Sequence, residues 1–160
     1  MIPEQTTALD LHVQRLTTCV ELVRLWPYFV EWLTFVRRCL RFNLPLTVYR
    51  RILQHAVTNP KMWVGVVHDS AGPVGFGCAH DVTPLLCVER EYEVSMLFHK
   101  TGRDDATIAL QTAFEDWCRA EGVVRYVIST RRDNPAAVRC FQSDRYGMKR
   151  AFTVFKKELK

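Results

Sequence analysis

Residues 62–79 have the sequence MWVGVVHDSAGPVGFGCA, and this stretch decides the class of fold. Met62 to Val67 is a run of apolar and β-branched residues, which is typical of a buried strand. His68 to Gly72 supplies turn chemistry, and Pro73 to Ala79 predicts a strand that returns beside the first. We therefore expect an antiparallel hairpin near the middle of the chain.

The next strand is predicted at Glu91 to Phe98, where polar and apolar residues alternate. Strict alternation puts Tyr92, Val94, Met96 and Phe98 on one face of the sheet. The polar residues, with Glu93 and Ser95 among them, then lie on the other face.

After this strand the pattern predicts a helix, a strand, a helix and a closing strand or strand pair. These elements are predicted at Asp104 to Gly122, Val123 to Thr130, Pro135 to about Tyr146 and Met148 to Leu159. The third of them is marked by Asn134 followed by Pro135, which is the preferred order of a helix cap and the first helical residue.

Upstream of the hairpin we expect one short strand and two helices. The strand is predicted at Leu11 to Leu16, and a capping box from Thr18 to Glu21 begins the first helix. Pro27 removes a backbone donor and is expected to kink or split this helix. The second helix is predicted at Thr47 to Thr58, before Asn59 and Pro60.

The order is therefore β-α-α-β-β-β-α-β-α-β, which predicts an α/β fold with a mixed, largely antiparallel central sheet flanked by helices. No repeat or flexible linker interrupts the sequence, so we expect a single domain over 1–160. Its N-terminal strand and helices occupy 1–60, and the sheet, the helix from Asp104 and the closing strands occupy 61–160.

Composition limits the possible functions. The chain has 22 Lys and Arg against 17 Asp and Glu, a net charge of +5, which suits a polyanionic ligand or simply a solvated basic surface. No motif favours nucleic acid, no apolar run predicts a membrane helix, and the start lacks signal-peptide features. The six cysteines show no zinc spacing, so we expect no metal and reduced, mostly buried thiols.

The element order, together with Ser129 to Ala137, Phe141 and Gly147-Met148, resembles the Gcn5-related N-acetyltransferase (GNAT) superfamily. The resemblance covers nearly all of the chain from about Leu11. It implies that acetyl-CoA lies between the strands at 91–98 and 123–130, and that its pantetheine pairs with exposed strand amides near Leu97 or Phe98. Asn134 and Phe141 belong to the matched signature beside the cofactor.

The resemblance also implies that the pyrophosphate of acetyl-CoA binds at the start of the helix near Asp104, where free backbone N–H groups and the helix dipole form an anion site. The family builds this site with glycines, which let the backbone approach the phosphates. This chain departs from the pattern. The matching residues are Arg103, Asp104, Asp105, Ala106 and Thr107. The two carboxylates repel a pyrophosphate by about one to several kcal/mol, and capping of the helix is their simpler role.

Candidate catalytic residues are Glu93, Ser95 and Tyr146. Glu93 is the candidate general base for an ammonium substrate, and a solvated carboxylate on the strand face is its simpler role. His80 and His99 are alternative bases. Family enzymes often use a tyrosine on the penultimate helix as general acid, but that position is Phe141 here, so Tyr146 is the remaining candidate.

Two functions stay open, and a nucleic-acid-associated basic domain is a distant third. The first is a GNAT-type N-acyltransferase that transfers an acetyl group from acetyl-CoA to an amine of a small molecule or protein. The second is a catalytically degenerate GNAT-fold protein that acts as a binding or structural component, for example in a bacteriophage virion. The expected location is the cytoplasm, or the virion for a phage-encoded protein. A protein partner or homo-oligomer is compatible with either function.

Overall fold

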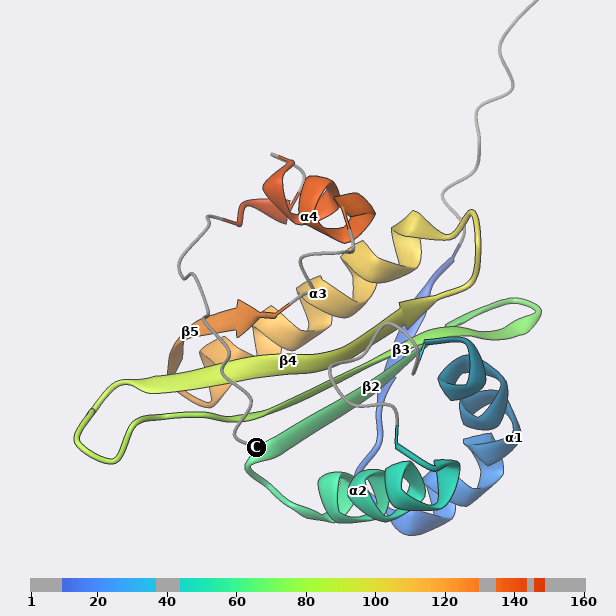
Figure 1. The fold of residues 1–160 in the computed structure, drawn as a ribbon, viewed down its shortest axis with the longest axis horizontal. Coiled ribbons are helices and arrows are strands. Elements are labelled where there is room, and N and C mark those ends of the chain that lie inside the picture. Colours follow the sequence, from blue (N-terminus) through green and yellow to red (C-terminus); the bar gives the residue numbers. More distant parts are fainter. Residues whose placement is uncertain (1–9, 37–43, 130–134, 144–145, 149–160) are drawn as a thin grey trace, which may run out of the picture. The chain divides into compact units, whose positions relative to one another are not determined.

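The computed structural model describes residues 10–36, 44–129, 135–143 and 146–148 (Figure 1). The chain separates into two compact units that divide between Ser129 and Thr130, and each is described here by itself. The expectation of one domain over 1–160 stays a prediction.

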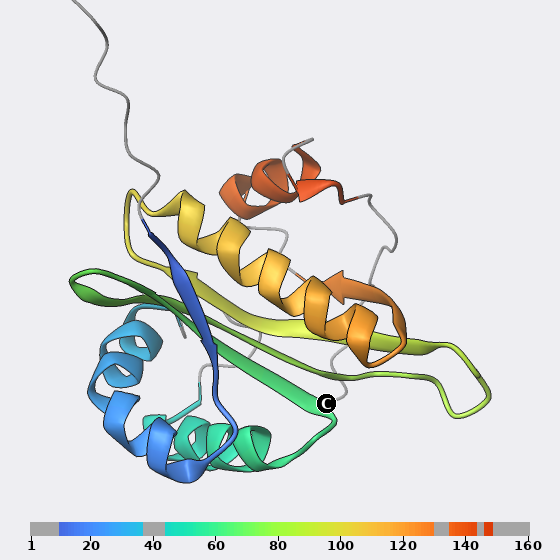
Figure 2. The ribbon, with the colours of Figure 1, turned by 180° about the vertical axis from the view of Figure 1, so that it is seen from behind.

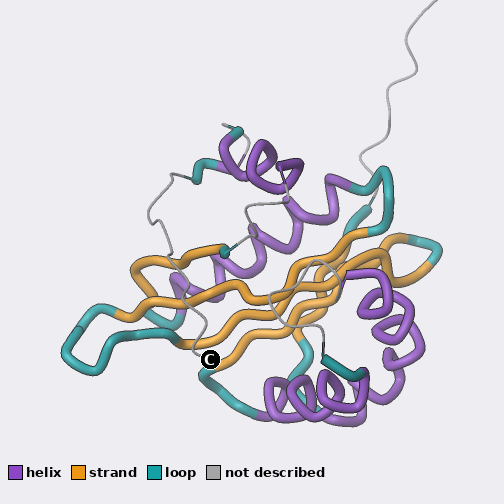
Figure 3. Tube along the Cα trace, viewed as in Figure 1, coloured by secondary structure: helices purple, strands orange, loops and turns teal. Residues whose placement is uncertain are grey.

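The first unit is built on a five-stranded sheet in which the strands follow one another in chain order. Figure 3 draws these strands in orange. The strands are β1 (His12–Arg15), β2 (Met62–Asp69), β3 (Gly72–Asp81), β4 (Arg90–His99) and β5 (Val123–Ile128). Neighbouring strands from β1 to β4 are antiparallel, and β5 is parallel to β4. The predicted mixed, largely antiparallel sheet is confirmed.

Helices cover both faces of this sheet (Figures 1 and 2). On one face α1 (Cys19–Val36) and α2 (Leu46–Thr58) pack over a core that includes Trp32, Leu53 and Phe76. On the other face α3 (Asp104–Ala120) packs over a separate core that includes Tyr92 and Phe114. The sheet therefore has no solvated face along its middle, which explains the continuous apolar runs of β2 and β3.

The start of α1 has the predicted capping box. The Thr18 hydroxyl accepts a hydrogen bond from the Glu21 amide (3.3 Å), and the Glu21 carboxylate accepts one from the Thr18 amide (3.0 Å). Pro27 does not split the helix, because α1 is one element from Cys19 to Val36, and the alternative of a kink at Pro27 stays a prediction.

The predicted facing of β4 is also wrong, and a β-bulge is the reason. Cys78 of β3 lies opposite Met96, but the next residue, Ala79, lies opposite Val94, so Ser95 is an extra residue in β4. Tyr92 and Val94 belong to the core under α3. Met96, beyond the bulge, belongs to the core under α1 and α2, where Phe98 also packs.

The second unit contains α4 (Pro135–Gln142). The helix therefore ends earlier than the predicted Tyr146, which lies in a short turn and is buried. Thr130, Asn134 and the predicted closing strand from Lys149 onward lie outside the described residues.

Candidate active site

The bulge at Ser95 coincides with the end of the pairing between β4 and β5. The last matched residues are Val94 and Ile128, whereas β4 continues to His99. Within the described residues, the far half of β4 therefore has a partner only on the β3 side.

The register shows which backbone groups face the side without a partner. The Lys100 amide donates to the Val74 carbonyl (2.8 Å), so Val74 and Lys100 form a hydrogen-bonded pair. Hydrogen-bonded pairs alternate along an antiparallel ladder, so the amide of Phe98 also faces β3, whereas the amide of Leu97 faces away from β3. The predicted donors were the amides of Leu97 and Phe98. Only the N–H of Leu97 points to the side of β4 on which the pairing with β5 has ended.

Glu93 lies just before the bulge. Its cross-strand partner is His80 of β3. Directly opposite residues share a face of the sheet, and the neighbours of Glu93 along β4, Tyr92 and Val94, belong to the core under α3. The Glu93 carboxylate and the His80 imidazole therefore project from the face that carries α1 and α2, and both side chains are partly exposed. This pairs a carboxylate with an imidazole beside the end of the β4–β5 ladder.

Ser95, the predicted neighbour of Glu93 in catalysis, is the bulged residue itself. Its hydroxyl donates a hydrogen bond to the carbonyl of Cys78 (3.3 Å). This bond ties the bulge to β3, so the Ser95 proton already has an acceptor in the fold.

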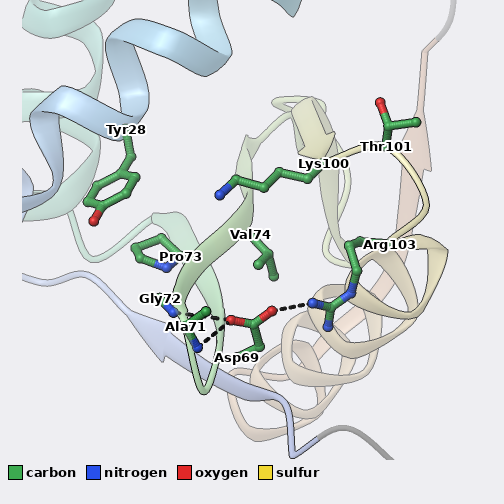
Figure 4. A pocket seen from close by; sticks show the side chains of 9 residues that line it. All are labelled: Tyr28, Asp69, Ala71, Gly72, Pro73, Val74, Lys100, Thr101 and Arg103. Carbon is green, nitrogen blue, oxygen red and sulfur yellow. Dashed lines mark hydrogen bonds and ion pairs between the residues drawn. The ribbon is translucent and has the colours of Figure 1, made fainter. Parts of the chain in front are cut away.

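The start of α3 is occupied by the chain's own charged side chains. The guanidinium of Arg103 donates two hydrogen bonds to the carboxylate of Asp105, from Nε to Oδ1 (3.0 Å) and from Nη2 to Oδ2 (3.1 Å). Its Nη1 forms an ion pair with Asp69. Asp69 in turn accepts hydrogen bonds from the amides of Ala71 and Gly72, as the dashed lines of Figure 4 show.

This arrangement shifts the pKa of both carboxyls. The pKa of Asp105 is lowered, chiefly by the hydrogen bond from Arg103 and further by the amides of Ala106 and of Asp105 itself. The pKa of Asp69 is lowered first by the Ala71 amide and then by Arg103. Both groups are therefore carboxylates near neutral pH.

The other residues expected around the pyrophosphate have different surroundings. Asp104 lies near His99, with 3.8 Å between Oδ1 and Nε2, and its side chain is exposed. Ala106 and Thr107 are buried, and the Ala106 amide donates to the Arg103 carbonyl (2.9 Å). The hydroxyl of Thr107 has no hydrogen-bond partner among the described residues.

The partnership of Arg103 with Asp69 was missed from the sequence. The two residues belong to different turns, and only the packing of the β2–β3 turn against the start of α3 brings them together. A pocket of about 220 Å³ lies beside this ion pair, between the turn, α1 and the segment after β4. Tyr28, Lys100 and Thr101 help to line it (Figure 4).

In the second unit, Phe141 lies in α4, and its ring contacts that of Tyr146 edge to face, with 5.8 Å between the ring centroids. Phe141 carries no acidic proton, so within this pair Tyr146 is the side chain that could serve as an acid.

The two buried cysteines, Cys78 and Cys118, are unsuited to nucleophilic catalysis. Burial raises the pKa of Cys78 to about 12 and that of Cys118 to about 11. No group of three metal-ligating side chains lies together in the described ranges. No helix within them is long and apolar enough to cross a membrane.

No protein-family model and no curated protein sequence matches the chain. Solved structures do match it. An aminoglycoside acetyltransferase from an uncultured soil metagenomic sample, in complex with trehalose, gives a TM-score of 0.71 at 16% identity over 94% of this chain and 97% of that chain. The ribosomal-protein-alanine N-acetyltransferase of Brucella melitensis biovar Abortus 2308 gives 0.67 at 14% identity, over 94% and 99%. The aminoglycoside N-acetyltransferase AAC(6')-Iy, in complex with CoA, gives 0.72 at 11% identity, over 99% of both chains.

The chain has the GNAT fold. The low identities show the fold alone, so the activity has to be argued from the site.

In this GNAT fold, the residues present fit one part of acetyl-CoA and not the other. The edge of β4 at Leu97 is unpaired among the residues that the structure describes, and it suits the amide-bearing pantetheine arm, since strand edges bind extended chains through main-chain hydrogen bonds. The start of α3 does not suit the diphosphate, because Asp105 already lies there as a carboxylate paired with Arg103.

Proposed function

We propose that this chain is an N-acyltransferase that transfers an acetyl group from a pantetheine thioester to an amine of a small molecule or protein. Acetyl-CoA is the donor expected from the GNAT fold. One observation carries the proposal: within the described residues the Leu97 amide has no partner on the β5 side, and the cross-strand pair of Glu93 and His80 lies earlier on the same strand. An electrophile-binding N–H and a candidate base therefore lie within a few residues of each other on one strand.

Each group has a defined task in the reaction. Glu93 accepts a proton from the substrate ammonium, directly or through water, and frees the lone pair of the amine. The nitrogen attacks the thioester carbonyl carbon, and the carbonyl electron pair moves to oxygen, where the Leu97 amide donates a hydrogen bond. The carbonyl then re-forms, the C–S bond breaks, and the thiolate leaves. The nitrogen loses its second proton to the departing thiolate or to water, so the product is a neutral amide.

Departure of the thiolate requires little help from an acid. A thiol has a pKa of about 8.5, so its anion is a stable leaving group near neutral pH and can take a proton from water. This accommodates Phe141 at the position where family enzymes often carry a tyrosine. Tyr146 stays the candidate for a proton donor of this chain.

The test is release of free thiol from acetyl-CoA or acetyl-pantetheine in the presence of a panel of primary amines, including aminoglycosides and peptides with a free N-terminus. Glu93→Gln is expected to lower kcat/KM by about 10²–10⁴-fold, the usual contribution of a general base. Glu89→Gln is the matched control, because it removes the same charge from a side chain that is 67% exposed at the start of the strand. Equal activity in both variants and the wild type would exclude Glu93 as the base.

A second candidate function is a GNAT-fold binding or structural component without acyl transfer, for example in a bacteriophage particle. The observation that favours it is the Asp69–Arg103–Asp105 arrangement at the start of α3. Thermal denaturation separates the two candidates. A thioester present at 100 times its Kd stabilises the fold by about 2.7 kcal/mol, whereas no shift with any thioester favours the second candidate.

A further inference from the structure

Backbone donors at the start of α3 are already engaged by the chain's own acceptors. An anion binds at a helix start through unpaired amides and the positive end of the helix dipole. Here the Ala106 amide is bonded to the Arg103 carbonyl, and the Arg103 amide is bonded to the Lys100 carbonyl (3.0 Å). The carboxylate of Asp105 lies in the first turn, where it already interacts with the dipole.

Arg103 cannot compensate, because its guanidinium is fully engaged. It binds Asp105 through two nitrogens and Asp69 through the third. Its side chain is only 17% exposed, and the partners come from two different segments of the chain. Around this one guanidinium, the carboxylates of Asp69 and Asp105 outnumber the single positive charge.

The edge of β4, in contrast, offers neutral hydrogen-bonding groups. The N–H of Leu97 faces the side on which β5 has ended. A pantetheine arm carries two amides that can pair with such an edge, and it has no charge that the nearby carboxylates repel. We infer that this protein recognises its acyl donor through the pantetheine arm and the thioester, and not through the nucleotide diphosphate. The inference rests on the proposed acyltransferase function.

The donor class is therefore pantetheine thioesters, and CoA is only one source of this chemistry. A protein that carries an acylated phosphopantetheine is another source. Acetyl-pantetheine, acetyl-CoA and an acetylated carrier protein distinguish these sources when each is supplied with the same amine.

The deciding measurement is kcat/KM for acetyl-pantetheine relative to acetyl-CoA in the wild-type protein. We expect the two values to agree within about tenfold, because only interactions made with the donor can favour one donor over the other. A preference for acetyl-CoA of about a hundredfold or more would overturn the inference and leave the acyltransferase function intact. Turnover of neither thioester would instead overturn the proposed function, and the inference with it.

Variants of Asp105 test the cause. Asp105→Asn keeps the shape of the side chain and removes its charge, and Asp105→Ala also removes its hydrogen bonds to Arg103. Both are expected to raise the preference for acetyl-CoA over acetyl-pantetheine by about tenfold, since the repulsion of the diphosphate is relieved. Asp116→Asn removes the same charge from the other end of α3 and is expected to leave the ratio unchanged. An unchanged ratio in folded Asp105→Asn would overturn the inference.

Discussion

The side chain of Asp69 fixes the turn between β2 and β3, and it also makes the stability of the fold depend on pH. Its Oδ1 accepts the Ala71 and Gly72 amides (2.8 and 3.1 Å), and its Oδ2 faces Arg103. A carboxyl with a lower pKa in the folded than in the unfolded chain stabilises the fold above the unfolded pKa. This contribution is lost as the pH falls through the folded pKa. The pKa values of Asp69, Asp105 and Glu21 are all lowered.

We therefore predict that stability toward urea is level near neutral pH and decreases as the pH falls below about 4, the ordinary carboxyl pKa. Asp69→Asn is expected to lower the urea midpoint at pH 7 and to make the acid decrease less steep. Asp116→Asn is the control, because its carboxyl is 68% exposed and pairs only within α3. Identical acid profiles of Asp69→Asn and the wild type would contradict this role.

Phe76 is one of the fully buried aromatic rings of the core under α1 and α2. It is fully buried, and its ring contacts those of Phe29, Trp32 and Phe98 at centroid distances of 4.9, 5.5 and 6.3 Å. We predict that Phe76→Ala lowers the free energy of unfolding by about 3–5 kcal/mol, the usual cost of deleting a buried aromatic ring. Phe35→Ala removes a ring that is 71% exposed and is expected to cost far less. Equal costs in urea titrations would show that the two rings are not distinguished by burial.

At the scale of elements, the bulge in β4 decides which side chains enter which core. Deleting Ser95 shifts the far half of the strand by one residue and turns Met96 and Phe98 toward the wrong face. We predict that the deletion abolishes cooperative unfolding, measured by tryptophan fluorescence. Ser95→Ala keeps the backbone and loses one hydrogen bond to Cys78, so it is expected to cost about 0.5–1.5 kcal/mol. A deletion variant as stable as Ser95→Ala would contradict the role of the bulge.

The elements that the sequence predicts well are those whose signal is local. The capping box at Thr18, the hairpin around Asp69 and the end of α3 at Gly122 were all predicted, because turn and cap residues act over a few positions. The faces on which the β4 side chains lie were not predicted correctly. The alternation of polar and apolar residues does not reveal the extra residue Ser95, because the bulge is defined only by the pairing with β3. For the same reason the sequence could not choose between the amides of Leu97 and Phe98.

The site was predictable only in part. Glu93 and the carboxylates at the start of α3 stand out by residue type alone. The ion pair between Arg103 and Asp69 cannot be recognised from the sequence, because it depends on two turns that meet in space. The sequence could therefore state that the diphosphate site departs from the family pattern, but it could not show that the site is filled by an ion pair.

At the scale of the molecule, β4 connects two ends of the first unit with different surfaces. Its far end, at His99, leads to the charged start of α3. Its near end, at Arg90, follows a loop whose apolar side chains are fully exposed: Leu85 is 104%, Leu86 99% and Val88 99% exposed. Figure 1 shows this β3–β4 loop projecting beyond the sheet. Association through this loop would therefore leave the candidate donor site open.

Exposed apolar side chains that adjoin one another favour association, because burying them removes apolar surface from water. We predict that the protein associates with increasing concentration, measured by light scattering, and that Leu85→Ser combined with Leu86→Ser and Val88→Ser prevents this. Because these side chains are exposed in the monomer, the free energy of unfolding of the triple variant should lie within about 0.5 kcal/mol of the wild-type value. A control in which Val20 and Val23 of α1, 62% and 52% exposed, become serine is expected to associate like the wild type. Association of the triple variant at wild-type concentrations would place the contact elsewhere. Unchanged turnover per chain in the monomeric triple variant would show that the donor end works independently of the loop.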